Sequence, residues 1–224
     1  MRQLHLPMRI WDLPTRLFHW ILVVLLLTSW LSAELGWMRL HVVSGLTVLT
    51  FLLFRLIWGF IGSDTARFSH FLKSPVEAIH HLVRLARREP DTEVGHNAAG
   101  GWMVIVLLAI LCVQVGTGLC ANDDVLTEGP LARIVGKERS DWLTHIHVVN
   151  FTLIEIAVAL HVLAIITYRV LKGHNLLLPM ITGKKRLPGA TRAPRMMHPI
   201  LALIVFAFSA LAIVVFLLLV GYKP

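Results

Sequence analysis

Two histidines, His147 and His161, stand fourteen positions apart in an otherwise apolar stretch of the chain. At about 1.5 Å of rise and about 100° of rotation per residue, this spacing covers about 21 Å of helix and returns to within about 40° of the same face. We therefore expect both imidazoles on one helix face, at two depths of a membrane. Ionisable side chains are costly in hydrocarbon, so their presence there predicts a functional site with partners.

Two further histidines in other apolar stretches are the candidate partners. His19 and His41 each lie a few residues inside their stretch, and up-and-down threading of the chain places them at opposite depths. Four histidines at two levels of a helical bundle are the axial ligands that two bis-histidine haems require. The alternative interpretation, four separate structural histidines in the core, does not account for the matched depths.

His145 competes with His147 for the role of ligand. It precedes His161 by sixteen positions, which corresponds to about 160° of rotation, so these two side chains would face away from each other. The spacing therefore favours His147.

The composition is that of a membrane protein. Hydrophobic residues make up 56% of the 224 residues and charged residues 15%, whereas soluble domains contain about 25% charged residues. A membrane span takes about 20 residues of helix, and five stretches are long enough, at about 15–33, 38–60, 98–120, 143–171 and 198–221. We expect an all-α integral membrane bundle of about five transmembrane helices. The first is expected to be retained, since the run after Arg16 has no small-residue cleavage site.

The net charge of +8 is better explained by membrane topology than by nucleic-acid binding. The connections between apolar stretches alternate in basic content, with 15 Lys and Arg on one side of the bundle, 5 on the other, and Arg55 inside a helix. By the positive-inside rule the N-terminus is cytoplasmic and the C-terminus periplasmic. The third connection is acidic and lies on the outer face, where it is a candidate contact for a periplasmic partner; its carboxylates are Asp123, Asp124, Glu128, Glu138 and Asp141.

Cysteine usage excludes one kind of haem attachment. Cys112 and Cys120 are eight residues apart on one predicted helix, about 12 Å along its axis, which is too far for a disulfide between them. We expect both to be packing residues. Because the chain has no Cys-x-x-Cys-His motif, covalent c-type haem is excluded, and any haem must be held by axial ligands.

The second connection carries a short amphipathic helix. Ser74 and Glu77 form a capping box with Pro75 at the first helical position, and apolar and basic residues alternate in faces over about 75–88. We expect this helix on the cytoplasmic membrane surface, as a structural interface helix or as a contact for anionic lipid or a partner. His80 and His81 are then ordinary interfacial residues.

Three segments resemble a known family. They are residues 11–20 (WDLPTRLFHW), residues 54–68 (FRLIWGFIGS and the following ARF) and residues 95–102 (GHNAAGGW). They look like the hallmark segments of the di-haem cytochrome b subunit of nickel-iron hydrogenases, whose superfamily includes bacterial cytochrome b561 and the membrane subunit of respiratory formate dehydrogenase. Ala98 departs from the proline that is common in relatives. The resemblance covers about residues 1–175, the expected di-haem core, and leaves a basic cytoplasmic loop and fifth helix in 176–224.

The resemblance implies a pairing of the four histidines. His19 and His161 would bind the haem on the cytoplasmic side, and His41 and His147 would bind the haem on the periplasmic side. The helical spacing leads to the same pairing.

Arginines and glycines near these histidines are further candidates for haem contact. Arg55, toward the inner end of the second helix, either pairs with a haem propionate or extends to the interface, and Arg16 is a candidate for the same part at the inner haem. Gly45, Gly116 and Gly118 either leave room for a macrocycle edge or serve close helix contact.

A quinone is the mobile partner that the resemblance implies. In the formate dehydrogenase relative, an asparagine and a nearby glycine before the third helix contact quinone, and Asn97 and Gly100 match that pattern. Asn97 offers a donor and an acceptor for a carbonyl, but a helix N-cap explains it equally well. His96 is a candidate for proton transfer or an exposed turn residue.

These observations predict an electron-transfer subunit of an oxidoreductase in a bacterial inner membrane. Two b haems would relay electrons between the quinone pool and a periplasmic dehydrogenase, hydrogenase or c-type cytochrome, in either direction, and a homo-oligomer is compatible with this reading. The alternative is a stand-alone superoxide:quinone oxidoreductase of cytochrome b561 type, and the third hypothesis is a structural membrane anchor. No residue pattern predicts nucleophilic or hydrolytic catalysis.

Overall fold

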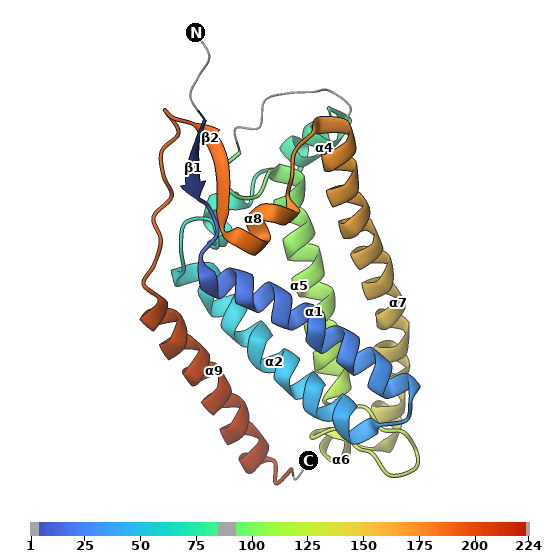
Figure 1. The fold of residues 1–224 in the computed structure, drawn as a ribbon. Coiled ribbons are helices and arrows are strands. Elements are labelled where there is room, and N and C mark those ends of the chain that lie inside the picture. Colours follow the sequence, from blue (N-terminus) through green and yellow to red (C-terminus); the bar gives the residue numbers. More distant parts are fainter. Residues whose placement is uncertain (1–4, 85–92, 223–224) are drawn as a thin grey trace. The chain divides into compact units, whose positions relative to one another are not determined.

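The computed structural model of the protein describes residues 5–84 and 93–222. Its described part contains five helices long and apolar enough to cross a membrane (Figure 1). They are α1 (Leu13–Glu34), α2 (Met38–Ile61), α5 (Ala98–Gly118), α7 (Lys137–Thr167) with its π-helical continuation η1 (Tyr168–Lys172), and α9 (Pro199–Leu219). The predicted all-α bundle of about five transmembrane helices is therefore confirmed.

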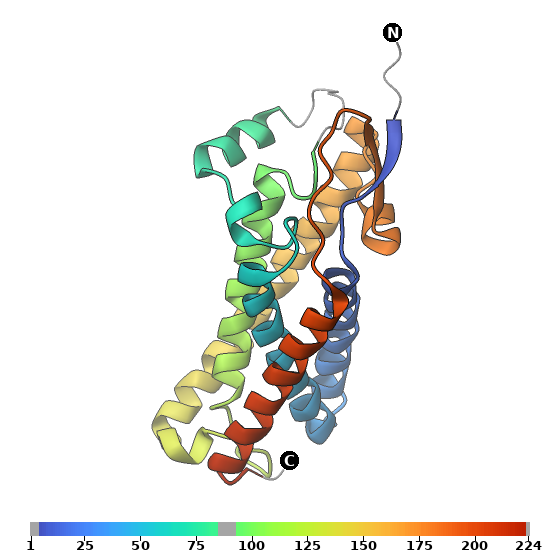
Figure 2. The same ribbon diagram turned by 90° about the vertical axis from the view of Figure 1, so that its left-hand side faces the viewer.

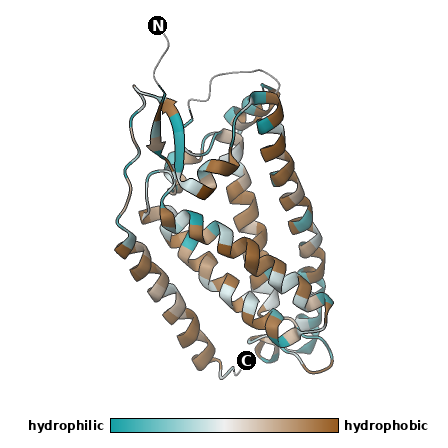
Figure 3. Cartoon of the chain, viewed as in Figure 1, coloured by the Kyte–Doolittle hydropathy of each residue, from teal (hydrophilic) through white to brown (hydrophobic). Residues whose placement is uncertain are grey.

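Shorter elements connect the long helices. They are α3 (Phe68–Phe71), α4 (Pro75–Val83), α6 (Ala132–Val135), α8 (Leu177–Thr182) and the strands β1 (His5–Arg9) and β2 (Lys184–Pro188). Apolar positions dominate the long helices, whereas β2 is mostly polar (Figure 3). Large apolar side chains are exposed along each long helix, among them Val24, Val43, Val106, Leu163 and Leu203. A surface of this kind is suited to lipid rather than to water.

The chain forms two compact units, and every long helix runs through both. The first unit comprises residues 1–17, 56–106 and 157–202, and the second comprises 18–55, 107–156 and 203–224. The segment after residue 175 is thus divided between the units. The predicted boundary at residue 175 between a di-haem core and a tail stays a prediction.

The fourth membrane helix begins earlier than its hydropathy predicts. We expected residues 143–171, but α7 starts at Lys137, and its last turn, η1, is π-helical. The added first turns are polar, and Lys137 pairs with Asp141 one turn later. Hydropathy finds only the apolar part of such a helix.

The amphipathic helix of the second connection is α4, the teal-green helix at the upper left of Figure 2. Ser74 accepts a hydrogen bond from the Glu77 backbone N–H at 3.2 Å, and Pro75 occupies the first turn. The predicted cap is confirmed. Residues 85–88 of the predicted helix lie outside the described residues.

The first unit also contains a two-stranded sheet that the sequence did not predict. β1 pairs antiparallel with β2 from His5 opposite Pro188 to Arg9 opposite Lys184. Ile10, Trp11 and Leu187 are buried beside the sheet. The sheet therefore fastens the start of the chain to the segment that follows α8.

Two polar residues fix the start of α1 in the first unit. Asp12 accepts hydrogen bonds from the Thr15 backbone N–H at 2.8 Å and from the Trp58 indole N–H at 3.1 Å. Thr65 donates to the Ile10 carbonyl at 2.6 Å. Asp12 is thus the N-cap of α1, and its hydrogen bond from Trp58 joins this cap to the end of α2.

A second polar contact holds the segment before α9. The Asp64 carboxylate accepts a hydrogen bond from the Arg195 backbone N–H at 2.8 Å, and Ser63 accepts one from Met197 at 2.9 Å. Burial raises the pKa of Asp64, but the hydrogen bonds from Arg195 and Arg67 outweigh it, and the net pKa is lowered. Asp64 is therefore held as a carboxylate that clasps this segment.

Candidate functional site

His41 and His147 face each other in the second unit. Their ring centroids are 6.0 Å apart and the ring planes are nearly perpendicular, at 86°. Two metal–nitrogen bonds of about 2 Å and two distances of about 1 Å from nitrogen to ring centre add up to about 6 Å. The separation therefore fits two imidazoles that ligate one iron from opposite sides.

Each of these two imidazoles donates its Nδ1 proton to a backbone carbonyl. His41 Nδ1 lies 2.8 Å from the Ser29 carbonyl oxygen, and His147 Nδ1 lies 2.9 Å from that of Gln114. Because a carbonyl can only accept, the proton is assigned to Nδ1, and Nε2 keeps its lone pair. Metal-ligating histidines characteristically have this arrangement, which fixes both the tautomer and the ring orientation.

The local backbone brings His41 to its partner on α1. Gly36 adopts a left-handed φ of +71° in the short connection between α1 and α2, and the Trp37 N–H donates to the Ser32 carbonyl at 2.7 Å. This tight reversal places Ser29 of α1 and His41 of α2 within hydrogen-bond distance.

Glycine is required beside His147. A Cβ atom at Gly118 would lie 2.8 Å from His147 Cε1, which is too close for any side chain. By contrast, a Cβ at Gly45 or Gly116 meets no described atom within 4 Å. Gly118 is therefore explained by close approach to His147, whereas Gly45 and Gly116 border open space.

Two amides that sequence reasoning missed lie beside His147. Gln114 Nε2 is 3.2 Å from His147 Nε2, and Asn150, only 5% exposed, donates to Gln114 Oε1 at 2.7 Å and to the Ile110 carbonyl at 2.9 Å. An iron bonded to His147 requires the Gln114 amide to turn away from Nε2. The sequence did contain a pattern that indicates a polar site here, because Gln114 and Asn150 are amides within largely apolar stretches of α5 and α7.

The other predicted haem ligands are described in separate units. His19, in the second unit, is half-buried with its ring 4.9 Å from that of Trp20, and His161, in the first unit, is also half-buried. Their pairing stays a prediction. His145 is exposed, whereas His147 is the residue that faces His41.

Of the two predicted propionate partners, Arg55 is buried and Arg16 is half-buried. Arg16 donates from Nη1 to the Ile181 carbonyl, and its Nε is buried with no hydrogen-bond partner among the described residues. Arg55 is only 3% exposed within α2. A guanidinium buried to this extent needs acceptors or a counter-anion, and a propionate is chemically suited to either.

Asn97 caps α5, as its alternative interpretation predicted. Its Oδ1 accepts from the Gly100 backbone N–H at 2.8 Å, and a Cβ at Gly100 would lie 3.3 Å from that oxygen. Its Nδ2 donates to the Tyr168 hydroxyl at 3.0 Å. The cap therefore accounts for Asn97 and for Gly100, and quinone contact stays a prediction.

The Tyr168 hydroxyl has a second partner that the sequence did not indicate. It lies 2.6 Å from Nε2 of His81 on α4. His81 is thus not merely an interfacial residue, and Tyr168 carries no spacing signal by which it might have been found.

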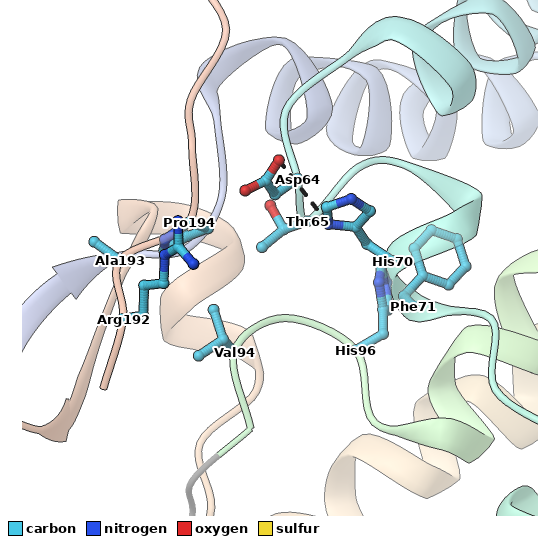
Figure 4. Close-up of a pocket in the computed structure, with 9 residues that line it drawn as sticks. All are labelled: Asp64, Thr65, His70, Phe71, Val94, His96, Arg192, Ala193 and Pro194. Atoms are coloured by element: carbon cyan, nitrogen blue, oxygen red, sulfur yellow. Dashed lines mark ion pairs between the residues drawn. The ribbon is translucent and has the colours of Figure 1, made fainter. Parts of the chain in front are cut away.

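His96 lines a pocket of about 370 Å³ in the first unit (Figure 4). Its ring lies 4.7 Å from that of Trp11 and 4.8 Å from that of Phe71. The pocket is also lined by Asp64 and His70, whose Oδ1 and Nδ1 atoms lie 3.9 Å apart. His96 is therefore packed between aromatic rings beside a polar cavity, rather than simply exposed at a turn.

The acidic third connection is largely compensated by its own basic residues. Lys137 pairs with Asp124 and Asp141, and Arg133 pairs with Glu128. The Asp123 carboxylate accepts three backbone N–H bonds from residues 125–127 at 2.8 to 2.9 Å. Burial raises the pKa of Asp123, but these bonds outweigh it and lower the pKa to about 2. A periplasmic contact there stays a prediction, with few uncompensated carboxylates to support it.

Only one of the two free cysteines has its predicted packing role. Cys112 and Cys120 are not bonded to each other; Cys120 is buried, whereas Cys112 is exposed on α5, so the packing prediction is wrong for Cys112. Burial raises the pKa of the Cys120 thiol, which disfavours the reactive thiolate.

Comparison with known proteins yields one family. The family model described as prokaryotic cytochrome b561 matches residues 10–183, which is most of the chain. In the same comparison, no curated protein and no solved structure matches the chain.

Proposed function

We propose that the chain, which belongs to the prokaryotic cytochrome b561 family, relays electrons between a periplasmic redox partner and the quinone pool. Members of this family are multi-pass proteins of the bacterial inner membrane that transfer electrons through haem b. The relay would use two haems per chain. The basic connections would face the cytoplasm and the short α1–α2 turn the periplasm.

The His41–His147 pair carries this proposal. Their imidazoles lie 6.0 Å apart, and each donates its Nδ1–H to a carbonyl, so their Nε2 atoms would hold the outer haem. His19 and His161 would hold the inner haem. Arg16 and Arg55 would neutralise propionates. Haem b supplies a one-electron carrier, and the protein sets its potential through the ligands, nearby charge and burial.

Quinone would react near the inner haem, beside Asn97 and Gly100. The Asn97 side-chain oxygen accepts the hydrogen bond that caps α5, and one of its amide N–H groups donates to Tyr168. Its second amide N–H would donate to a quinone carbonyl. The outer haem would exchange electrons with a dehydrogenase, a hydrogenase or a c-type cytochrome.

The haem count tests the proposal directly. Purified protein should contain two b haems per chain by pyridine-haemochrome analysis, and a redox titration should resolve two low-spin components. A ratio of one haem per chain would show that one of the histidine pairs is wrong.

A stand-alone superoxide:quinone oxidoreductase is the second candidate. The acidic connection favours it, because Lys137 and Arg133 pair with three of the carboxylates that a partner protein would otherwise meet. Isolation in mild detergent separates the two functions. Copurification of a redox protein supports the subunit, whereas steady turnover of superoxide by the isolated chain supports the oxidase.

A further inference from the structure

Three side chains from three elements form a hydrogen-bonded chain in the first unit. Asn97, in the segment before α5, donates to the Tyr168 hydroxyl at 3.0 Å, and that hydroxyl lies 2.6 Å from His81 Nε2 on α4. The His81 and Tyr168 rings are also nearly parallel, at 13°. The chain links a half-buried imidazole on an exposed helix to a tyrosine that is 6% exposed.

The direction of each hydrogen bond follows from its donors. The Asn97 amide N–H can only donate, so the Tyr168 oxygen accepts from it. The Tyr168 proton is then directed at Nε2 of neutral His81. When His81 is protonated, Nε2 donates instead, and the Tyr168 proton must turn to another acceptor. Protonation of His81 therefore turns the Tyr168 hydroxyl proton away from His81.

A cation and a π-helical turn adjoin Tyr168. Lys172 Nζ lies 5.9 Å from the Tyr168 ring centroid, so a positive charge faces the ring. Tyr168 also opens the π-helical turn η1, and such turns recur at functional sites.

We propose that His81 and Tyr168 deliver the protons for quinone reduction, an inference that rests on the proposed function. Reduction of a quinone takes two electrons, which arrive through haem-b electron transfer, and two protons, and it forms two O–H bonds. For each proton, the Tyr168 O–H bond breaks as its proton passes to a quinone oxygen held near Asn97. The Tyr168 oxygen then takes the Nε2 proton of His81, and His81 takes a proton from water. Two passes give the quinol, and quinol oxidation runs the same steps in reverse.

A structural tether is the alternative, because the same hydrogen bonds join α4 to the end of α7. The two roles differ in what they require of residue 81. A tether needs only a hydrogen-bonding side chain, whereas proton delivery needs one that gains and loses a proton. Glutamine and glutamate are close in size and differ in that property.

The experiment uses the full-length haem-loaded protein, reduced chemically and then oxidised by one of two acceptors. Ferricyanide takes an electron without a proton, whereas a short-chain quinone needs both. For Tyr168→Phe, oxidation by quinone should slow by about 10-fold or more while the quinone KM and the ferricyanide rate stay unchanged. His81→Gln should slow the quinone reaction similarly, and His81→Glu should recover much of it. His80→Gln, the exposed neighbour on α4, is the control and should match the wild type.

The outcomes separate the inference from its premise. Unchanged quinone rates in Tyr168→Phe or His81→Gln would overturn proton delivery. Equal rates in His81→Gln and His81→Glu, or a parallel loss with ferricyanide, would leave a tether. If Tyr168→Phe does not fold, the three variants at the exposed position 80 and the half-buried position 81 still decide the question. A wild-type protein that quinone cannot oxidise would overturn the proposed function itself, and the inference with it.

Discussion

His41 and His147 of the second unit differ from His81 of the first unit in their hydrogen-bond partners. In the second unit, His41 and His147 each donate Nδ1–H to a backbone carbonyl, which has no proton to give back. In the first unit, His81 meets the Tyr168 hydroxyl, which can donate or accept. A carbonyl partner locks the imidazole into one tautomer and suits it to a metal. A hydroxyl partner lets the proton move and suits it to acid–base chemistry.

Loss of either locked histidine should have the largest effect. His41→Ala or His147→Ala should lower the haem content from about two to about one per chain, since one axial ligand does not retain a bis-histidine haem. Pyridine-haemochrome analysis and redox titration measure this loss. His145→Ala is the matched control, and a haem lost there but kept in His147→Ala would mean that the register of α7 is wrong.

The same separation should hold at the other pair. His19→Ala or His161→Ala should remove the inner haem and leave the outer one, as judged by which component of the redox titration disappears. Loss of the same component as in His41→Ala would break the proposed pairing.

A side chain at Gly118 should disturb the locked geometry without removing a ligand. In Gly118→Ala the new Cβ would lie 2.8 Å from His147 Cε1, and such overpacking costs about 1–3 kcal/mol. We expect partial loss of the outer haem or a shift in its potential. Gly116→Ala meets no described atom within 4 Å. Haem loss in that variant as well would place a macrocycle edge beside residue 116.

Asn97→Asp sharpens the contrast in the first unit. Aspartate still caps α5, but it lacks the N–H group that Asn97 donates to Tyr168 and the second N–H that would serve a quinone carbonyl. With a hydrogen bond worth about 0.5–1.5 kcal/mol, electron exchange with a quinone analogue should slow by about 3- to 10-fold with both haem signals intact. Unchanged quinone kinetics would leave Asn97 as a cap alone.

The smallest effect is expected at the helix that carries His81. Ser74→Ala removes the N-cap of α4, which is worth about 1 kcal/mol. Amide hydrogen exchange in α4 should therefore become faster by about five-fold, with a smaller effect on quinone kinetics. Lys73→Ala, one residue before the cap, should leave the exchange rates unchanged.

Local patterns predicted the helices well and the polar contacts poorly. Twenty apolar residues or a Ser-Pro-x-Glu sequence act within one element, so they can be read without knowing the fold. Pairing of β1 with β2 joins positions 175 to 183 residues apart, and both strands contain proline and basic residues that disfavour a strand prediction.

The candidate site divides in the same way. Helical periodicity selected His147 over His145, because both lie on one helix. The hydrogen bonds of Tyr168 are to His81 on α4 and to Asn97 before α5, which are far from it in the sequence. No pattern within η1 predicts these contacts. Gln114 and Asn150 stand between these cases, since an amide in an apolar helix signals a polar neighbour without saying which.

The β1–β2 pair also sets an order on biosynthesis. β1 leaves the ribosome before α1, yet its partner strand β2 ends at Pro188, after α1, α2, α5 and α7. At about 5–20 residues per second, β1 waits roughly 10–40 s for that partner. The sheet can therefore close only after α1, α2, α5 and α7 have all been synthesised, so that its formation reports that these four helices are already in place.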